Sequence, residues 1–303
     1  MNLNKLRLFI QLSRPLFLLG AMLFYILGVS MARYLGTSID WGLYGLGQIW
    51  VTLMQLSTHY LNEYFDAPQD ISHTNRTFFS GGSGAIGAGK LSRNTPLIAA
   101  AVTLTLAASN TVVLLQRAPT SPLPILLLIM IAFGAIFYSV PPIKLATSGY
   151  GELTTSFLVA NLVPALAFVL QNGEYHRILA MSTFPLTALF LAMMLVFEFP
   201  DYATDLKHEK RTLLVRLGWQ RGMTLHNFLI LSAFLILGLA VFSGLPASIA
   251  LPVFIPLPLG LLQIWQMRRI AAGGKPNWHS MGLSAIVLMM SAVYLLAFGY
   301  WMR

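Results

Sequence analysis

Residues 41–70 read WGLYGLGQIWVTLMQLSTHYLNEYFDAPQD, a stretch that begins apolar and ends polar. Residues 41–62 contain no Asp, Glu, Lys or Arg, and as a helix they are long enough to cross the ~30 Å hydrocarbon core of a bilayer. Asn62, Asp66 and Asp70 follow at intervals of four, which places them on one face of a continuing helix. The stretch therefore predicts a membrane-spanning helix that carries oxygen-bearing side chains at one end.

The whole chain has the composition of a polytopic, all-α membrane protein. Of its 303 residues, 56% are hydrophobic and only 10% are charged, whereas soluble domains carry about 25% charged residues. Nine weakly charged stretches are each long enough to span a bilayer as a helix. They are residues 15–32, 41–62, 95–116, 118–143, 153–173, 178–197, 228–246, 247–267 and 280–302.

The net charge of +9 is explained by the expected membrane topology, so it does not indicate a nucleic-acid-binding surface. With the N-terminus inside, nine spans place 15 of the 19 basic residues on the inner side, as the positive-inside rule requires of the cytoplasmic side. The chain has no cysteine, which excludes disulfides and thiolate metal sites. We expect an integral protein of the cell membrane (the inner membrane in a prokaryote) that contacts the lipid bilayer, with no nucleic acid and no obligate protein partner.

Eight of the ten acidic residues fall on the same inner side, and six of them form two clusters at the ends of spans 2 and 6. The clusters are Glu63, Asp66 and Asp70, and Glu198, Asp201 and Asp205. Such acids can simply be solvated or paired with basic residues, but like charges one turn apart in a partly dehydrated site favour a cation between them. Hard oxygen ligands suit Mg²⁺, which takes one or two carboxylates together with substrate phosphate. Two facing clusters therefore predict a diphosphate held by Mg²⁺.

The spacing within each cluster is helical, and one polar stripe runs along span 2 through Gln55, His59, Asn62, Asp66 and Asp70. We interpret His59 as a packed polar residue rather than a ligand. Pro68 and Pro200 are expected to end or bend the two helices, because proline removes a backbone donor. The offset of four spans between the clusters suggests that spans 1–4 and 5–8 form a repeat within one membrane-embedded domain, residues 1–303.

Further motifs accompany these clusters in order along the chain. NEYFDAPQD (62–70) fits N-x-x-x-D-x-x-x-D, and DYATD (201–205) fits D-x-x-x-D. The others are RP (14–15), YSVPPIKL (138–145), GYGEL (149–153) and KRTLLVRLG (210–218). With this ordered set the chain resembles the UbiA-type intramembrane prenyltransferases. NRTFFSGGSGAIGAGKLS (75–92) resembles the loop of members that act on 1,4-dihydroxy-2-naphthoate.

The resemblance implies a helical bundle around a central cavity and Mg²⁺-dependent transfer of a polyprenyl group from its diphosphate to an aromatic acceptor. The implied acceptor is 1,4-dihydroxy-2-naphthoate, as in menaquinone biosynthesis, with the active site on the cytoplasmic side. The implied metal ligands are Asn62, Asp66, Asp70, Asp201 and Asp205, and the four carboxylates are also catalytic, together with Tyr138. The implied substrate-binding residues are Asn62, Arg14, Arg76, Lys144, Lys210 and Glu198. Glu198 stands where asparagine is common in the family.

Other functions remain open at the level of the sequence. The same motifs suit a UbiA-type enzyme with another acceptor, such as 4-hydroxybenzoate, a glycerol phosphate ether lipid or a porphyrin-like ring. An ion-coupled transporter also carries acids and prolines within membrane helices, although its acids usually lie near the midplane. The glycine-rich residues 80–89 either bind an anion through backbone N–H groups or only cap the cavity, and both interpretations allow a lid.

Overall fold

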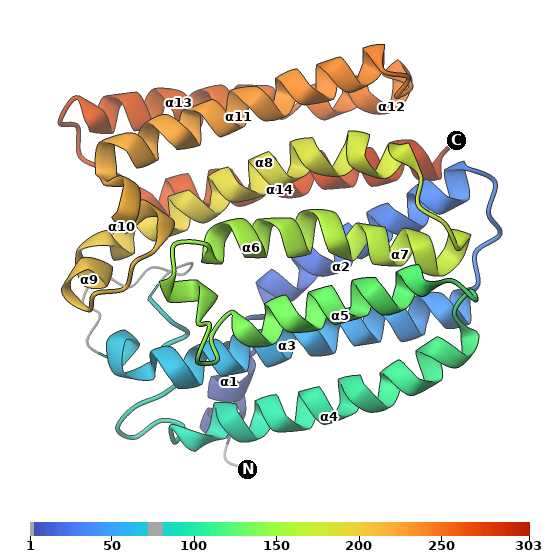
Figure 1. Ribbon diagram of the computed structural model, residues 1–303. Coiled ribbons are helices and arrows are strands. Elements are labelled where there is room, and N and C mark those ends of the chain that lie inside the picture. Colours follow the sequence, from blue (N-terminus) through green and yellow to red (C-terminus); the bar gives the residue numbers. More distant parts are fainter. Residues whose placement is uncertain (1–2, 72–80) are drawn as a thin grey trace.

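The computed structural model describes residues 3–71 and 81–303, and of residues 69–71 only the backbone is described. Every regular element in these ranges is helical. Long helices run side by side, and their connections gather at the two ends of the bundle (Figure 1). The predicted all-helical fold is therefore confirmed.

The helices coincide with the predicted apolar stretches. α1 (Leu3–Leu12) precedes them, and short elements connect them: η1 (Leu145–Thr147), η3 (Phe199–Asp201), α9 (Tyr202–Lys207) and α10 (Leu213–Leu217). The elements of the bundle are α2 (Pro15–Tyr34), α3 (Trp41–Ile71), α4 (Asn94–Arg117), α5 (Pro122–Phe137), α6 (Gly151–Phe157), η2 (Leu158–Leu162), α7 (Val163–Asn172), α8 (Arg177–Glu198), α11 (Trp219–Phe242), α12 (Ala247–Ala250), η4 (Leu251–Phe254), α13 (Leu257–Ala271) and α14 (Trp278–Trp301).

The predicted number of nine membrane spans is not confirmed. Within the ranges that the structure covers, seven helical segments are long and apolar enough to cross a membrane. α5 is short, with 16 residues, whereas α3 has 31 residues but carries its polar stripe along one face. Seven such segments still make the chain an integral membrane protein.

Proline explains most of the places where a helix changes form. Pro200 interrupts span 6, so α8 ends at Glu198, η3 adds one 3₁₀ turn, and α9 restarts the helix. Pro164 follows the π-helical η2, where the helix widens ahead of a residue that has no N–H. Pro68 lies inside α3, which continues to Ile71, so of the two expected effects of Pro68 the helix end before Asp70 is not found. Because Pro68 is exposed and near the helix end, water can bond the carbonyl that it leaves without a donor.

Small residues let the helices of the bundle approach closely. Gly28 of α2 faces α7, and a Cβ at this position would lie 2.1 Å from the carbonyl oxygen of Pro164. α2 and α7 therefore touch backbone to backbone, as small residues commonly allow in membranes. The buried core extends from Ala21 on α2 to Tyr300 on α14 and joins the first and last parts of the bundle.

One end of the bundle collects the segments that carry the predicted motifs. Residues 81–93, residues 138–150 and the elements from η3 to α10 all lie there, at what we call the motif end (Figure 1). The α2–α3, α4–α5 and α7–α8 connections lie at the opposite end. Both acidic clusters therefore face the same end, as their positions after spans 2 and 6 predict.

Candidate active site

The first acidic motif lies near the end of α3. Asn62 Nδ2 donates a hydrogen bond to Asp66 Oδ2 at 2.9 Å across one helical turn, and a longer one to Ser139 Oγ at 3.5 Å. Asp66 is buried. Asp70 continues the stripe one turn further along α3, but its side chain lies outside the described residues, as does Arg76.

The second motif is anchored by aromatic rings around the break at Pro200. Phe199 stacks on Trp278 with ring centroids 5.3 Å apart, and Trp219 packs edge-on against Phe199 at 5.0 Å. These contacts hold η3 against the first turns of α11 and α14. Asp201, at the end of η3, accepts a hydrogen bond from Gly81 N–H through Oδ2 at 3.1 Å.

Lys210 joins the two motifs. Its Nζ donates to Asp66 Oδ2 at 3.2 Å, and its backbone N–H donates to the carbonyl oxygen of Asp205 at 2.9 Å. Asp66, Asp201, Asp205 and Lys210 all line one cavity. The two acidic clusters, far apart in the sequence, therefore meet in space as the helix topology predicts.

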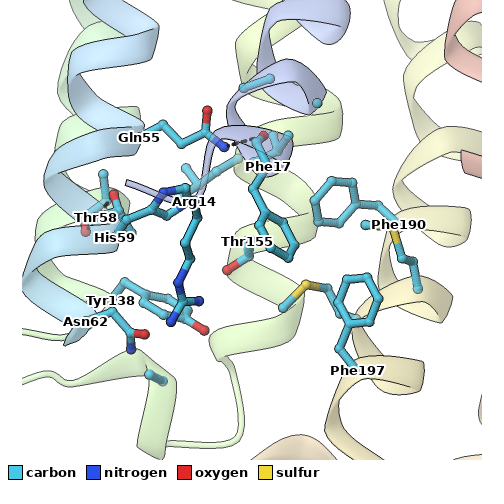
Figure 2. Close-up of a pocket in the computed structure, with 18 of the residues that line it drawn as sticks. Arg14, Phe17, Gln55, Thr58, His59, Asn62, Tyr138, Thr155, Phe190 and Phe197 are labelled. Carbon is cyan, nitrogen blue, oxygen red and sulfur yellow. Dashed lines mark hydrogen bonds between the residues drawn. The ribbon is translucent and has the colours of Figure 1, made fainter. Parts of the chain in front are cut away.

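The cavity has a volume of about 710 Å³, with a polar end that passes into an apolar chamber. The acidic residues, Asn62, Arg14 and Tyr138 line the polar end, and three phenylalanines, Phe17, Phe190 and Phe197, line the chamber (Figure 2). Other chamber walls come from aliphatic and methionine side chains of α2, α5, α8 and α14. One continuous space thus offers a charged environment and a hydrocarbon environment side by side.

The polar end fits Mg²⁺ only together with a further ligand. Among the side chains that the structure describes, in residues 3–68 and 81–303, no three from His, Cys, Asp or Glu lie close enough to hold a metal ion by themselves. Asp66 comes from α3, whereas Asp201 and Asp205 come from η3 and α9. Mg²⁺ usually binds one or two carboxylates and takes its other ligands from water and substrate phosphate. Carboxylates from separate elements around one cavity would therefore suit Mg²⁺ that takes its remaining ligands from water and a phosphate group.

The sequence of residues 21–284 matches the UbiA prenyltransferase family. The chain belongs to this family. Its motifs and its bundle thus come from a family of prenyltransferases, and the predicted class of enzyme is confirmed. No curated protein matches the chain in sequence.

Solved structures of UbiA proteins share the fold. A structure of digeranylgeranylglyceryl phosphate synthase has 17% identity and a TM-score of 0.66, and the match covers 99% of both chains. A UbiA homolog from Archaeoglobus fulgidus bound to GPP and Mg²⁺ has 16% identity and a TM-score of 0.64 over 95% of this chain and 99% of that chain. The apo structure of a UbiA homolog from Aeropyrum pernix K1 has 12% identity and a TM-score of 0.64 over 93% and 96%.

Most residues that the UbiA resemblance implies for substrate binding lie at the cavity. Those that line it are Arg14, Asn62, Glu198 and Lys210, together with the implied catalytic Tyr138. Lys144 is the described exception: it precedes η1 with a positive φ of 46° and is not one of the lining residues. Tyr138 directly follows the end of α5, and its phenol is neutral at pH 7, as is usual for tyrosine.

Glu198, which departs from the UbiA pattern, adjoins a second buried carboxyl group. Glu152 of α6 is 2% exposed, and its Oε1 accepts a hydrogen bond from Leu213 N–H at 2.8 Å. The Oε2 atoms of Glu152 and Glu198 are both buried, and neither receives a hydrogen bond from an ordinary donor among the described residues. The two carboxyl groups lie close enough to interact, and a hydrogen bond between them requires a proton on one of them, because a carboxylate only accepts. Of this pair, Glu198 lines the cavity.

His59 and Thr155 are among the polar side chains of the UbiA cavity that were not predicted as site residues. His59, interpreted as a packed residue, lines the cavity, and its Nδ1 lies 3.2 Å from the carbonyl oxygen of Ser13. A carbonyl oxygen only accepts, so Nδ1 of His59 carries a proton. Thr155 of α6 also points into the cavity (Figure 2). The polar stripe of span 2 was a signal for His59, whereas Thr155 follows the GYGEL motif with no such pattern.

Proposed function

We propose that this protein transfers a polyprenyl group from its diphosphate to an aromatic acceptor and requires Mg²⁺. The observation that carries this proposal is the single cavity in which Asp66, Asp201 and Asp205 border a largely apolar chamber. A prenyl diphosphate joins a charged head to a hydrocarbon chain and matches both environments. Further support comes from the A. fulgidus UbiA homolog, whose structures contain GPP or DMAPP together with Mg²⁺.

We propose that Asn62, Asp66, Asp70, Asp201 and Asp205 hold the metal. Asn62 donates its amide N–H to Asp66, which turns the amide oxygen away as a further oxygen ligand. Asp66 Oδ2 also accepts from Lys210, so its carboxylate is oriented before any ligand binds. When bound, Mg²⁺ neutralises charge on the diphosphate and makes it a better leaving group.

Cationic side chains are proposed to stabilise the leaving diphosphate. Arg14 and Lys210 both line the polar end. When the C–O bond of the prenyl diphosphate breaks, negative charge grows on the diphosphate oxygens, and preorganised donors at that position lower the barrier. Arg76 stays in this proposal on the UbiA resemblance alone. Lys144 contributes only if it turns toward the cavity.

Aromatic rings are proposed to face the carbon end of the breaking bond. The allylic group departs with positive charge, which the faces of aromatic rings attract. Tyr138 offers a neutral ring at the junction of the polar end and the chamber. Phe17 and Phe197 pack edge-on with centroids 6.1 Å apart on the chamber wall. Such an apolar chamber also excludes water, which otherwise captures the cation and yields free prenol.

The acceptor is proposed to be 1,4-dihydroxy-2-naphthoate, which would make this a menaquinone-pathway enzyme. The support is the resemblance of residues 75–92 to the loop of such members, of which residues 81–92 are described. The likeness to digeranylgeranylglyceryl phosphate synthase concerns the fold, so a glycerol phosphate ether lipid is an acceptor to test rather than a second proposal.

The site is proposed to face the cytoplasm from the cell membrane, with the whole chain acting as one prenyltransferase domain. The predicted topology, with 15 of the 19 basic residues on the inner side, supports this orientation of the motif end. A buried core that extends from α2 to α14 supports a single domain.

The test uses purified protein in lipid nanodiscs, a labelled polyprenyl diphosphate and a panel of acceptors. We expect prenylated naphthoate to form only with Mg²⁺. Asp66→Asn and Asp201→Asn should each lower turnover by on the order of 10²–10⁴ with unchanged thermal unfolding. If the enzyme prefers 4-hydroxybenzoate or an ether lipid, that compound takes the place of 1,4-dihydroxy-2-naphthoate as the proposed acceptor. Ion flux without diphosphate release would favour a transporter, and wild-type turnover in either variant would refute the metal assignment.

A further inference from the structure

Glu63 is a buried carboxylate that neither the proposed metal site nor the proposed diphosphate site uses. It follows Asn62 on α3 but is turned to another face of the helix, and it is not one of the residues that line the cavity. Only 2% of its surface is exposed. A buried carboxylate needs donors for its oxygens, and here three donors meet it.

The three donors come from two different segments. Arg14 Nη2, at the junction of α1 and α2, bonds Glu63 Oε1 in a salt bridge. Ser83 donates its backbone N–H to the same Oε1 at 2.6 Å and its hydroxyl to Oε2 at 2.7 Å. Both oxygens of the carboxylate are thus engaged, and each bond is charge-assisted and therefore strong.

Arg14 reaches the site from a strained position. Its φ of 49° is left-handed, and its guanidinium points toward the polar end, where Asn62 and Tyr138 lie (Figure 2). A guanidinium carries five N–H donors in a fixed plane, so a carboxylate that holds Nη2 also sets the direction of the others. The bond to Glu63 therefore aims Arg14 into the cavity.

Ser83 carries the same anchor into residues 81–91. Gln11 Nε2 donates to Ser83 O at 2.6 Å, and further along the segment Ala85 and Leu91 are buried. Two residues before Ser83, Gly81 bonds Asp201, and Gly81 and Gly82 line the cavity. The segment thus crosses from the first acidic motif to the second, with Glu63 as its fixed point on α3.

We propose that Glu63 is a positioning residue that holds Arg14 and the 81–83 segment in place at the polar end of the cavity. This inference rests on the proposed function, because Arg14 is taken to contact the diphosphate. Glu63 acts through these partners and does not bind the metal, since both of its oxygens already accept from Arg14 and Ser83.

The first test compares Glu63→Gln with Glu174→Gln, a matched change at a carboxylate in the α7–α8 connection, at the opposite end of the bundle. For Glu63→Gln we expect a rise of about tenfold in KM for prenyl diphosphate, the effect of losing one charge-assisted hydrogen bond. The Mg²⁺ concentration for half-maximal activity should not change. Glu174→Gln should match the wild type. A shifted Mg²⁺ requirement in Glu63→Gln would make Glu63 a metal ligand and overturn the proposal.

The second test is a double-variant cycle with Arg14→Gln. If Glu63 acts through Arg14, Glu63→Gln should add little to the KM of Arg14→Gln. If the two single-variant effects on KM instead multiply in the double variant, Glu63 acts independently of Arg14, and the proposal is overturned. Ser83→Ala keeps the salt bridge and is the milder variant if Glu63→Gln folds poorly. It should raise the yield of free prenol relative to prenylated product, whereas an unchanged ratio would contradict the anchoring of the segment.

Hydrogen exchange separates this inference from the proposed function. Amide protection at residues 81–91 should fall in Glu63→Gln and Ser83→Ala but not in Glu174→Gln, and this readout needs no turnover. If the wild type transfers no prenyl group but protection falls as expected, the proposed function fails and the anchoring role of Glu63 stands. If protection is the same in all variants, the anchoring role fails whatever the enzyme does.

Discussion

Replacing Gly28 with alanine should destabilise the bundle, because α2 and α7 touch at this residue. A Cβ at position 28 would lie 2.1 Å from the carbonyl oxygen of Pro164 and 2.8 Å from the Cβ of Ala167. Real Cβ atoms essentially never come closer than 3.0 Å to such neighbours, so the helices must separate locally by about 0.9 Å. The oxygen belongs to the backbone and cannot swing aside as a side chain would.

Two opposing terms set the magnitude. Gly→Ala inside a helix gains about 1 kcal/mol of intrinsic helix stability. Overpacking of a tight contact costs about 1–3 kcal/mol, and the upper value applies here because backbone must move. The net loss for Gly28→Ala is about 2 kcal/mol, or roughly 30-fold in the ratio of folded to unfolded protein. At Gly20 on the same helix, a Cβ would meet only Met290 Cε at 3.6 Å, an ordinary contact, so Gly20→Ala should gain stability.

The assay is unfolding by SDS of protein purified in mild detergent, followed by circular dichroism. Gly28→Ala should unfold at a lower SDS fraction than the wild type, and Gly20→Ala at an equal or higher one. Adding Ala167→Gly to Gly28→Ala should restore little of the lost stability, because the shorter contact with the carbonyl oxygen of Pro164 remains. If Gly28→Ala proves as stable as Gly20→Ala, the close packing of α2 on α7 is wrong.

Three further outcomes test the site and the topology. Lys210→Gln should lower kcat/KM for prenyl diphosphate by on the order of 10², because Lys210 lines the polar end, whereas Lys144→Gln should stay close to wild type in the same steady-state assay. Glu198→Gln should keep the thermal midpoint, since an amide can still donate to Glu152. Glu198→Leu should lower it by leaving a buried carboxyl oxygen unpaired, and equal midpoints for the two variants would contradict a hydrogen bond between Glu198 and Glu152. Reporter fusions at Gly87 and Lys207 should both report a cytoplasmic position, and a periplasmic signal at either would refute the predicted orientation.

The sequence was sufficient where local chemistry decides the structure. Residues 41–62 form a helix, as predicted for an uncharged segment that would have to satisfy its own backbone in a bilayer. The four-residue spacing then fixes Asn62 and Asp66 on one face of α3, and their side chains are hydrogen-bonded at 2.9 Å. The even number of spans between the two motifs placed them at the same end of the bundle. That parity is why their meeting in one cavity could be predicted without a structure.

The sequence was insufficient where contacts join distant elements. Glu152 sits in a short motif like any helix-starting acid, and only the fold brings it against Glu198 and the N–H of Leu213. Lys144 has the residue type and loop position of a phosphate ligand, yet its backbone conformation leaves it outside the cavity lining. Gln55 and His59 share the stripe of Asp66, but whether such residues face a cavity or a neighbouring helix depends on how α2 packs beside α3.

The distribution of unusual backbone conformations also favours an active site at the motif end of the bundle. Among the described residues other than glycine, those with positive φ are Arg14, Lys144 and Glu209. Each lies between helical elements: Arg14 joins α1 to α2 and lines the cavity, Lys144 precedes η1, and Glu209 separates α9 from α10. A left-handed conformation costs such residues about 1–2 kcal/mol, and irregular backbone is tolerated beside lipid only where polar partners or water satisfy it. The apolar bundle leaves only its ends for such turns, and at the motif end they bring charged side chains and backbone N–H groups around one cavity. A membrane enzyme that must bind a diphosphate therefore gathers its strained and charged residues where its helices can be interrupted.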